Sequence, residues 1–296
     1  MKSLKLIILA AAVLTACHPN GLQPDAAKAI RIEAGIAQTK MATSGDASAF
    51  EPGDQLALYA WINDPSTGQP VERVVDGGVF QLANTGVWSP LSSILWFDMV
   101  TPHYFIGVYP ANSKIADLHA GAFTLNPADQ AASDLLIATN LTGLKANDNP
   151  VSLTFEHAMA RLRVNLNFRN QWDGTPTVSS VAATAATTAT VNYETKAVTA
   201  GAATASVSLP AQATPAEGFA LSYGSLMVPQ AGFRTLTITI EGKEYVFTHS
   251  ADIPLASGKT TVVNLTMGRD KIELASDITI KDWTAGDSIN GEAQDE

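Results

Sequence analysis

The sequence contains a single cysteine, Cys17, among its 296 residues. A chain with one thiol can form no internal disulfide, and it cannot build the multi-thiolate sites that hold structural zinc. Charged residues are also scarce, because they make up only 16% of the chain, and the formal net charge is −10. Since an acidic surface repels polyanions, we expect neither nucleic acid nor anionic lipid among the partners of the folded part.

The sequence also lacks the local motifs of the common enzyme classes. It has no Gly-x-Ser-x-Gly elbow, no His-Glu-x-x-His motif, no phosphate-binding loop and no dinucleotide fingerprint. No two of its five histidines lie within four residues of each other, so no local metal-binding pair forms: His18, His103, His119, His157 and His249. We therefore predict that the chain is not an enzyme, and we expect no metal site and no cofactor.

After the first residues, no apolar run approaches the roughly 20 residues that a transmembrane helix needs. The N-terminus itself has a positive start at Lys2 and Lys5, a short apolar stretch over 6–13, and then Ala16-Cys17. This order predicts a lipoprotein signal peptide, residues 1–16, that is cleaved between Ala16 and Cys17. Residues 17–27 then form a lipidated tether, with the lipid on Cys17. The alternative is an ordinary signal peptide followed by an incidental cysteine.

The sequence is rich in short apolar runs with the period of two that is typical of β-strands. Residues 55–62 are apolar on both faces, which indicates a central strand, and residues 236–249 read as a hairpin. Residues 95–100 are a further strand candidate, whereas the polar residues 38–48 read as a loop that contains Lys40. Near the start of the folded part, one face of a strand is apolar through Ile30, Ile32, Ala34 and Ile36. Many short strands separated by turns predict an all-β chain of β-sandwiches, with enough length for two domains.

A change of alternation marks the middle of the chain. The apolar residues Val151, Leu153 and Phe155 occupy odd positions, whereas residues 162–168 are apolar at even positions. A strand cannot change parity without turning its core face to solvent, so the chain must bend near His157. We place the domain boundary here, between an N-terminal domain at 28–156 and a C-terminal domain at 157–296.

Two sets of residues near these strands allow more than one interpretation. His157 could act as a buried polar switch, but we favour a histidine that bonds a backbone carbonyl at the bend. Aromatic faces can stack on sugars or fill a core, and the candidates are Trp61, Trp88, Trp96 and Tyr109. Trp61 lies within an apolar run, which favours a core position, and Trp88 and Trp96 stay open.

Five features in this order resemble the fimbrillin-like lipoproteins of the Bacteroidetes, the subunits and relatives of type V pili. They are the signal ending at Cys17, the strand over 30–36 followed by Thr39-Lys40, the segment Phe50-Glu-Pro-Gly-Asp-Gln-Leu-Ala-Leu-Tyr-Ala, the segment 151–166, and Ser257-Gly-Lys-Thr with the C-terminal segment 278–283. Together these features span nearly the whole chain.

The resemblance implies two transthyretin-like β-sandwich domains in tandem and no catalysis. It also implies a subunit or accessory subunit of a cell-surface fimbria, lipid-anchored in the outer membrane through Cys17, whose partners are other fimbrial subunits. In the family, a protease cuts after the first strand, and a strand of the next subunit replaces it. Here the exchanged strand would be Ile30, Ile32, Ala34 and Ile36, and Lys40 stands where the family has an arginine at the cut site. The alternative is a non-polymerising surface lipoprotein that binds host glycan or protein.

Overall fold

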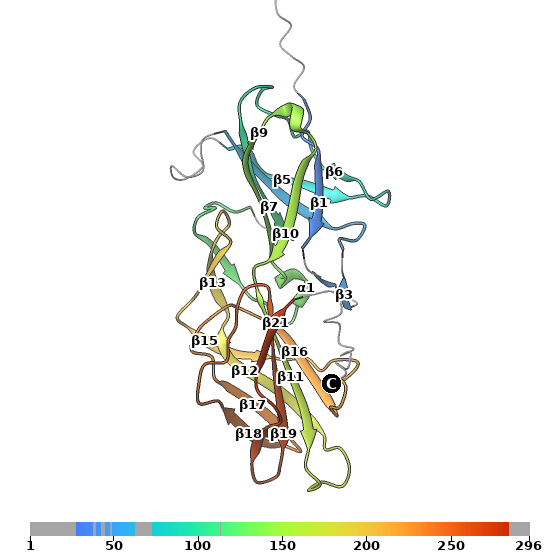
Figure 1. The fold of residues 1–296 in the computed structure, drawn as a ribbon, viewed down its shortest axis with the longest axis vertical. Coiled ribbons are helices and arrows are strands. Elements are labelled where there is room, and N and C mark those ends of the chain that lie inside the picture. Colours follow the sequence, from blue (N-terminus) through green and yellow to red (C-terminus); the bar gives the residue numbers. More distant parts are fainter. Residues whose placement is uncertain are drawn as a thin grey trace, which may run out of the picture.

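The computed structural model describes residues 28–37, 40–42, 45–47, 49–62, 73–112 and 114–283. Its regular structure is almost entirely β, and the helices in this part are α1 (Gln130–Ser133) and the 3₁₀ turn η2 (Ala146–Asp148). The molecule is elongated, with one large sheet at one end and several smaller sheets toward the other (Figure 1). This arrangement confirms the predicted all-β class.

The large sheet has seven strands in the order β1-β10-β9-β7-β4-β5-β6. All neighbours are antiparallel except β1 and β10, which run parallel. The strands in this order are β1 (Ile32–Ile36), β10 (Val151–His157), β9 (Leu136–Leu144), β7 (His103–Tyr109), β4 (Gln55–Trp61), β5 (Arg73–Leu82) and β6 (Trp88–Pro90).

Strand β4 lies between β5 and β7, and it is buried on both faces, as its unbroken apolar run predicts. Leu56 and Leu58 belong to a core formed by the seven-stranded sheet and the chain before β1. Tyr59 and Trp61 point to the other face and join a second core, which extends through the C-terminal sheets. One strand therefore links the two cores.

The remaining sheets are smaller, and most of their strands come from the C-terminal half. A five-stranded sheet contains β16 (Leu221–Met227), β11 (Ala160–Phe168), β19 (Lys259–Met267), β20 (Ile272–Leu274) and, paired with β19, β21 (Thr279–Asp282). A four-stranded sheet contains β15 (Thr204–Ser208), β12 (Val178–Ala186), β17 (Thr235–Ile240) and β18 (Lys243–Thr248). A three-stranded sheet joins β14 (Ala197–Ala200), β13 (Thr188–Asn192) and β8 (Gly121–Thr124), and a hairpin joins β2 (Lys40–Ala42) and β3 (Gly45–Ala47).

The chain changes sheets where the alternation changes parity. Strand β10 ends at His157, and β11 begins at Ala160 in the five-stranded sheet. However, β8 pairs with β13 across the expected boundary, and the second core includes residues from both sides of it. The division into tandem domains at 156/157 therefore stays a prediction.

Strand β11 departs from the expectation of one apolar face and one polar face. Leu162, Val164 and Leu166 are buried as predicted, whereas Phe168 is only half-buried. The opposite face is buried as well and carries Arg161, Arg163 and Asn165. Asn165 lies in a polar network, because its amide donates to the side chain of Asn264 (2.8 Å) and its carbonyl accepts from Ser222 (2.6 Å).

Two strand predictions have opposite outcomes. The hairpin is confirmed, because β17 and β18 pair around Glu241 and Gly242, which both have positive φ. The strand over 95–100 is wrong, because this segment makes only an isolated bridge from Leu95 to Ala29. Asp98 ends any extended pairing here by accepting hydrogen bonds from the backbone of Val100 and Thr101, which closes a turn.

Candidate functional site

Strand β1 forms one edge of the seven-stranded sheet. It pairs with β10 and with no second strand in the described part of the chain, and Ile32, Ala34 and Ile36 lie opposite Val151, Leu153 and Phe155. Of the four apolar residues predicted on this strand, Ile30 and Ile32 are buried, whereas Ala34 and Ile36 are partly buried against the same core. Ile30 itself precedes the strand by two residues.

The chain just before β1 is held by two further contacts. The N–H of Ile30 donates to the carbonyl of Ile94, and the N–H of Trp96 donates to the carbonyl of Lys28, both at 2.9 Å. On the other side, the side chain of Asn149 accepts from the N–H of Arg31 and donates to the carbonyl of Ala29, again at 2.9 Å. Hydrogen bonds therefore hold residues 28–31 on two sides. Sequence reasoning missed Asn149, because nothing local shows that it faces a distant backbone.

An open groove lies beside β1. This groove of about 740 Å³ is lined by residues of β1 and of the segment that leads into β6. Strands β1 and β6 are the two outer strands of the sheet, and both are labelled in Figure 1. We call this groove the β1 groove, and its apolar walls come from Ala34, Ile36, Phe50, Val87, Trp88 and Pro150. The ring of Phe50 packs edge-on against Trp88 (5.2 Å), Tyr109 (5.3 Å) and Phe155 (5.4 Å). An apolar groove next to an edge strand has the form of a site that accepts an extended segment.

The predicted cut site follows β1 within four residues. Lys40 begins β2, which pairs with β3 in a short hairpin. The prediction of a loop without strands over 38–48 is therefore wrong, because two three-residue strands lie within these positions. Ala16 and Cys17, the predicted cleavage and lipidation sites, lie outside the described residues.

The candidate sugar platform is not formed. Trp61, Trp88, Trp96 and Tyr109 are all buried, so their faces pack in the cores instead of facing solvent. Trp61 stacks on Tyr104, and Trp96 packs edge-on against His103 and Phe105. Their burial supports the core interpretation for all four.

His157 has a buried side-chain partner that the sequence did not predict. Its Nδ1 lies 2.7 Å from a carboxylate oxygen of Asp134, and both side chains are fully buried. The bond to a backbone carbonyl that we favoured from the sequence stays a prediction, because this contact accounts for Nδ1 alone. The imidazole also stacks on Trp283, with ring centroids 3.8 Å apart, and the guanidinium of Arg161 lies over the same indole at 5.5 Å. This cluster fixes the end of β21 at the point where the chain crosses between sheets.

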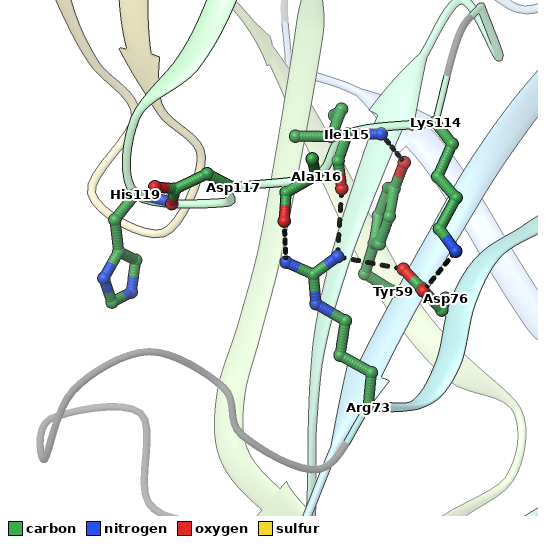
Figure 2. A network of polar contacts seen from close by, with 8 residues as sticks. All are labelled: Tyr59, Arg73, Asp76, Lys114, Ile115, Ala116, Asp117 and His119. Carbon is green, nitrogen blue, oxygen red and sulfur yellow. Dashed lines mark hydrogen bonds and ion pairs between the residues drawn. The ribbon is translucent and has the colours of Figure 1, made fainter.

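A second polar cluster lies between β5 and the segment 114–120 (Figure 2). The guanidinium of Arg73 donates to Asp76 and to the carbonyls of Ile115 and Ala116, each at 2.9 Å. Lys114 also contacts Asp76, at 2.5 Å. Desolvation acts to raise the pKa of Asp76, but the hydrogen bonds and charges of Lys114 and Arg73 outweigh it, and the pKa is lowered.

The rest of this cluster is also satisfied internally. Burial raises the pKa of Tyr59, whose hydroxyl accepts from the N–H of Ile115 at 2.9 Å. Asp117 accepts from the N–H groups of His119 and Ala120, and His119 in turn contacts Glu194 at 2.7 Å. Figure 2 shows that side chains of β4 and β5 bond the segment 114–116 to the sheet. Within the described ranges, no group of three His, Cys, Asp or Glu side chains is placed to hold a metal ion.

A comparison with family models assigns the chain to a family. The family model described as fimbrillin-like matches residues 39–283. The chain belongs to the fimbrillin-like family. No curated protein matches it, and none of the helices in the described part is long and apolar enough to cross a membrane.

Solved structures show the same fold at low identity. A protein from Bacteroides ovatus provisionally assigned to cell adhesion is 19% identical, with a TM-score of 0.64 over 88% of this chain and 99% of its own. A similarly assigned protein from Bacteroides uniformis is 19% identical, with a TM-score of 0.63 over 86% of this chain and 98% of its own. A fimbrial protein from Bacteroides vulgatus is 12% identical, with a TM-score of 0.52 over 86% of this chain and 99% of its own.

Proposed function

We propose that this fimbrillin-like protein is the lipid-anchored precursor of a cell-surface fimbrial subunit, and that it assembles by strand exchange. Cleavage at Lys40 would release β1 from the rest of the chain, and a strand of another subunit would take its place. The observation that carries this proposal is the position of β1. It is an edge strand that pairs with one neighbouring strand, β10, and its apolar face lies in the core. An open groove runs beside it.

The energetics of this edge favour replacement over simple loss. Removal of β1 would leave the ladder of β10 unpaired and expose Val151, Leu153 and Phe155, so a cleaved β1 should stay bound until a competitor arrives. An incoming strand regains the same main-chain bonds and similar apolar burial, at about 25 cal/mol per Å². Further contacts in the β1 groove, where Phe50 and Trp88 form the walls, would drive the exchange.

The C-terminal strand is the candidate donor. All four residues of β21 are exposed, and Ile280 keeps 46% of its surface open although it lies in a strand. Ile278 and Ile280 share one face of an extended segment, as Ile30 and Ile32 do at the other end of the chain. Donation by a second subunit would require β21 to leave β19, its partner in the free subunit.

The test is limited cleavage of the purified precursor with a lysine-specific protease, followed by gel filtration and electron microscopy. We expect the intact precursor to be monomeric and the cleaved protein to form polymers. Lys40→Ala should block both cleavage after β1 and polymerisation. Lys28→Ala is the matched control, because Lys28 lies on the other side of β1 and cleavage there leaves the strand attached.

A protein that is cut cleanly at Lys40 and stays monomeric at every concentration would favour the alternative of a non-polymerising surface lipoprotein. Anchoring is tested separately. If Cys17 carries the lipid, Cys17→Ser should move the protein out of the membrane fraction or leave its signal peptide uncleaved. Retention of a cleaved Cys17→Ser protein in membranes would contradict the assignment of the anchor.

A further inference from the structure

The loop between β6 and β7 exposes large apolar side chains. Leu95, Phe97 and Val100 leave 39%, 63% and 71% of their surfaces open. Single exposed apolar residues are ordinary, but three within six positions form a concentrated patch. We call residues 94–101 the apolar loop.

The backbone of the apolar loop is held by hydrogen bonds to two side chains, those of Asp98 and His103. The carboxylate of Asp98 accepts from the N–H groups of Val100 (2.8 Å) and Thr101 (2.6 Å) and from the hydroxyl of Thr101 (2.5 Å). The buried ring of His103 accepts from the N–H of Phe97 at 3.1 Å and donates to the carbonyl of Thr101 at 2.8 Å. Burial lowers the pKa of His103, which keeps the neutral form that this pair of bonds requires. Asp98, the one acidic residue of the loop, therefore accepts hydrogen bonds from donors of the loop itself.

The apolar loop lies where the described chain begins. Trp96 donates to the carbonyl of Lys28 at 2.9 Å, and Leu95 bridges Ala29. Lys28 follows Cys17 by eleven positions, and eleven extended residues reach at most about 36–40 Å. A lipid on Cys17 would therefore keep this loop within that distance of the bilayer. A short tether also gives a high effective concentration, so a weak second contact suffices.

We propose that the apolar loop is a membrane contact, and that Leu95, Phe97 and Val100 insert into the bilayer that holds the Cys17 lipid. This inference rests on the lipid anchor of the proposed function. The position of the loop beside the tether favours a bilayer over a second subunit as its partner. Insertion here is apolar, so it needs no attraction between an acidic protein and anionic lipid, and zwitterionic lipid is the appropriate probe.

The experiment uses the chain that begins at Cys17, coupled through this sole thiol to a maleimide lipid in phosphatidylcholine vesicles. A tryptophan is introduced as Phe97→Trp or Val100→Trp. Val246→Trp is the matched control, because Val246 is 55% exposed on β18, near the opposite end of the molecule (Figure 1). Vesicles with brominated acyl chains quench tryptophans that enter the bilayer. We expect the added fluorescence at 97 and 100 to be quenched and shifted to the blue, and that at 246 to match its value in plain vesicles.

Equal fluorescence at 97 and 246 in brominated vesicles would overturn the proposal. So would a blue shift at 97 that grows with protein concentration without vesicles, because that result assigns the loop to contacts between subunits. Chemical coupling replaces the natural lipid, so the outcome does not depend on whether cells lipidate Cys17. Fractionation of Cys17→Ser cells tests that point separately.

Discussion

At the scale of single residues, alternation predicts burial well only where one face of a strand is solvated. Val151, Leu153 and Phe155 are buried and Ser152 and Thr154 are exposed, as the pattern on β10 requires. On β11 the same reasoning fails for Arg161 and Arg163, which are polar and yet buried, because polar partners and the indole of Trp283 can cover a face that hydropathy marks as solvent.

Two neighbouring positions at the C-terminal end of β11 should respond differently to truncation. Leu166→Ala should lower the free energy of unfolding by about 2–5 kcal/mol, because Leu166 is fully buried and leaves a cavity. Phe168→Ala should cost less than the roughly 3–5 kcal/mol of a core phenylalanine, because Phe168 is only half-buried. Urea denaturation measures both. A larger loss for Phe168→Ala than for Leu166→Ala would contradict the burial described here.

At the scale of elements, strands with strong periodicity could be predicted and strands defined by remote partners could not. The first strand, the central strand β4 and the hairpin β17–β18 follow from local patterns. The segment 95–100 has the composition of a strand, but local hydrogen bonds to Asp98 fold it into a turn. The short hairpin β2–β3 has only three residues in each strand, too few for a period of two to be recognised in the sequence.

The same scale applies to β21, a strand that is held chiefly at one end. Its four residues are exposed, whereas the next residue, Trp283, is buried and stacks on His157. The backbone N–H of Trp283 donates to the carbonyl of Gly258 at 3.1 Å. Trp283→Ala should therefore free β21 and increase hydrogen exchange along its partner β19, at Thr260 and Val262.

The control for β21 is Ile280→Ala, which trims a half-exposed side chain of the same strand and should leave exchange along β19 nearly unchanged. Hydrogen exchange followed by mass spectrometry compares the two variants with the wild type. Equal protection of β19 in wild type and Trp283→Ala would show that the ladder, and not the indole, retains the strand.

At the scale of the whole molecule, the all-β class could be predicted, but the assembly of the sheets could not. Strand order depends on contacts between residues far apart in sequence, such as the parallel pairing of β1 with β10 and the bond of Asn149 to the backbone of residues 29–31. The β1 groove is lined by segments that are far apart in the sequence, at 31–36, 49–50 and 86–88, so no local motif marks it.

The central claim is that assembly requires β1 to leave β10. Gly35 and Thr154 lie opposite each other on the solvent side of this pair, and a Cβ added at Gly35 meets nothing within 4 Å. In a Cys17→Ser background, Gly35→Cys with Thr154→Cys should form a disulfide that locks β1 in place. A single Gly35→Cys variant is the matched control.

The decisive measurement is polymer formation by this double-cysteine protein after cleavage at Lys40, with and without a reducing agent, followed by gel filtration. The account predicts that the oxidised, cleaved protein stays monomeric, that reduction restores polymers, and that the single variant polymerises under both conditions. Polymers from the locked, oxidised protein, or none from the reduced one, would contradict it.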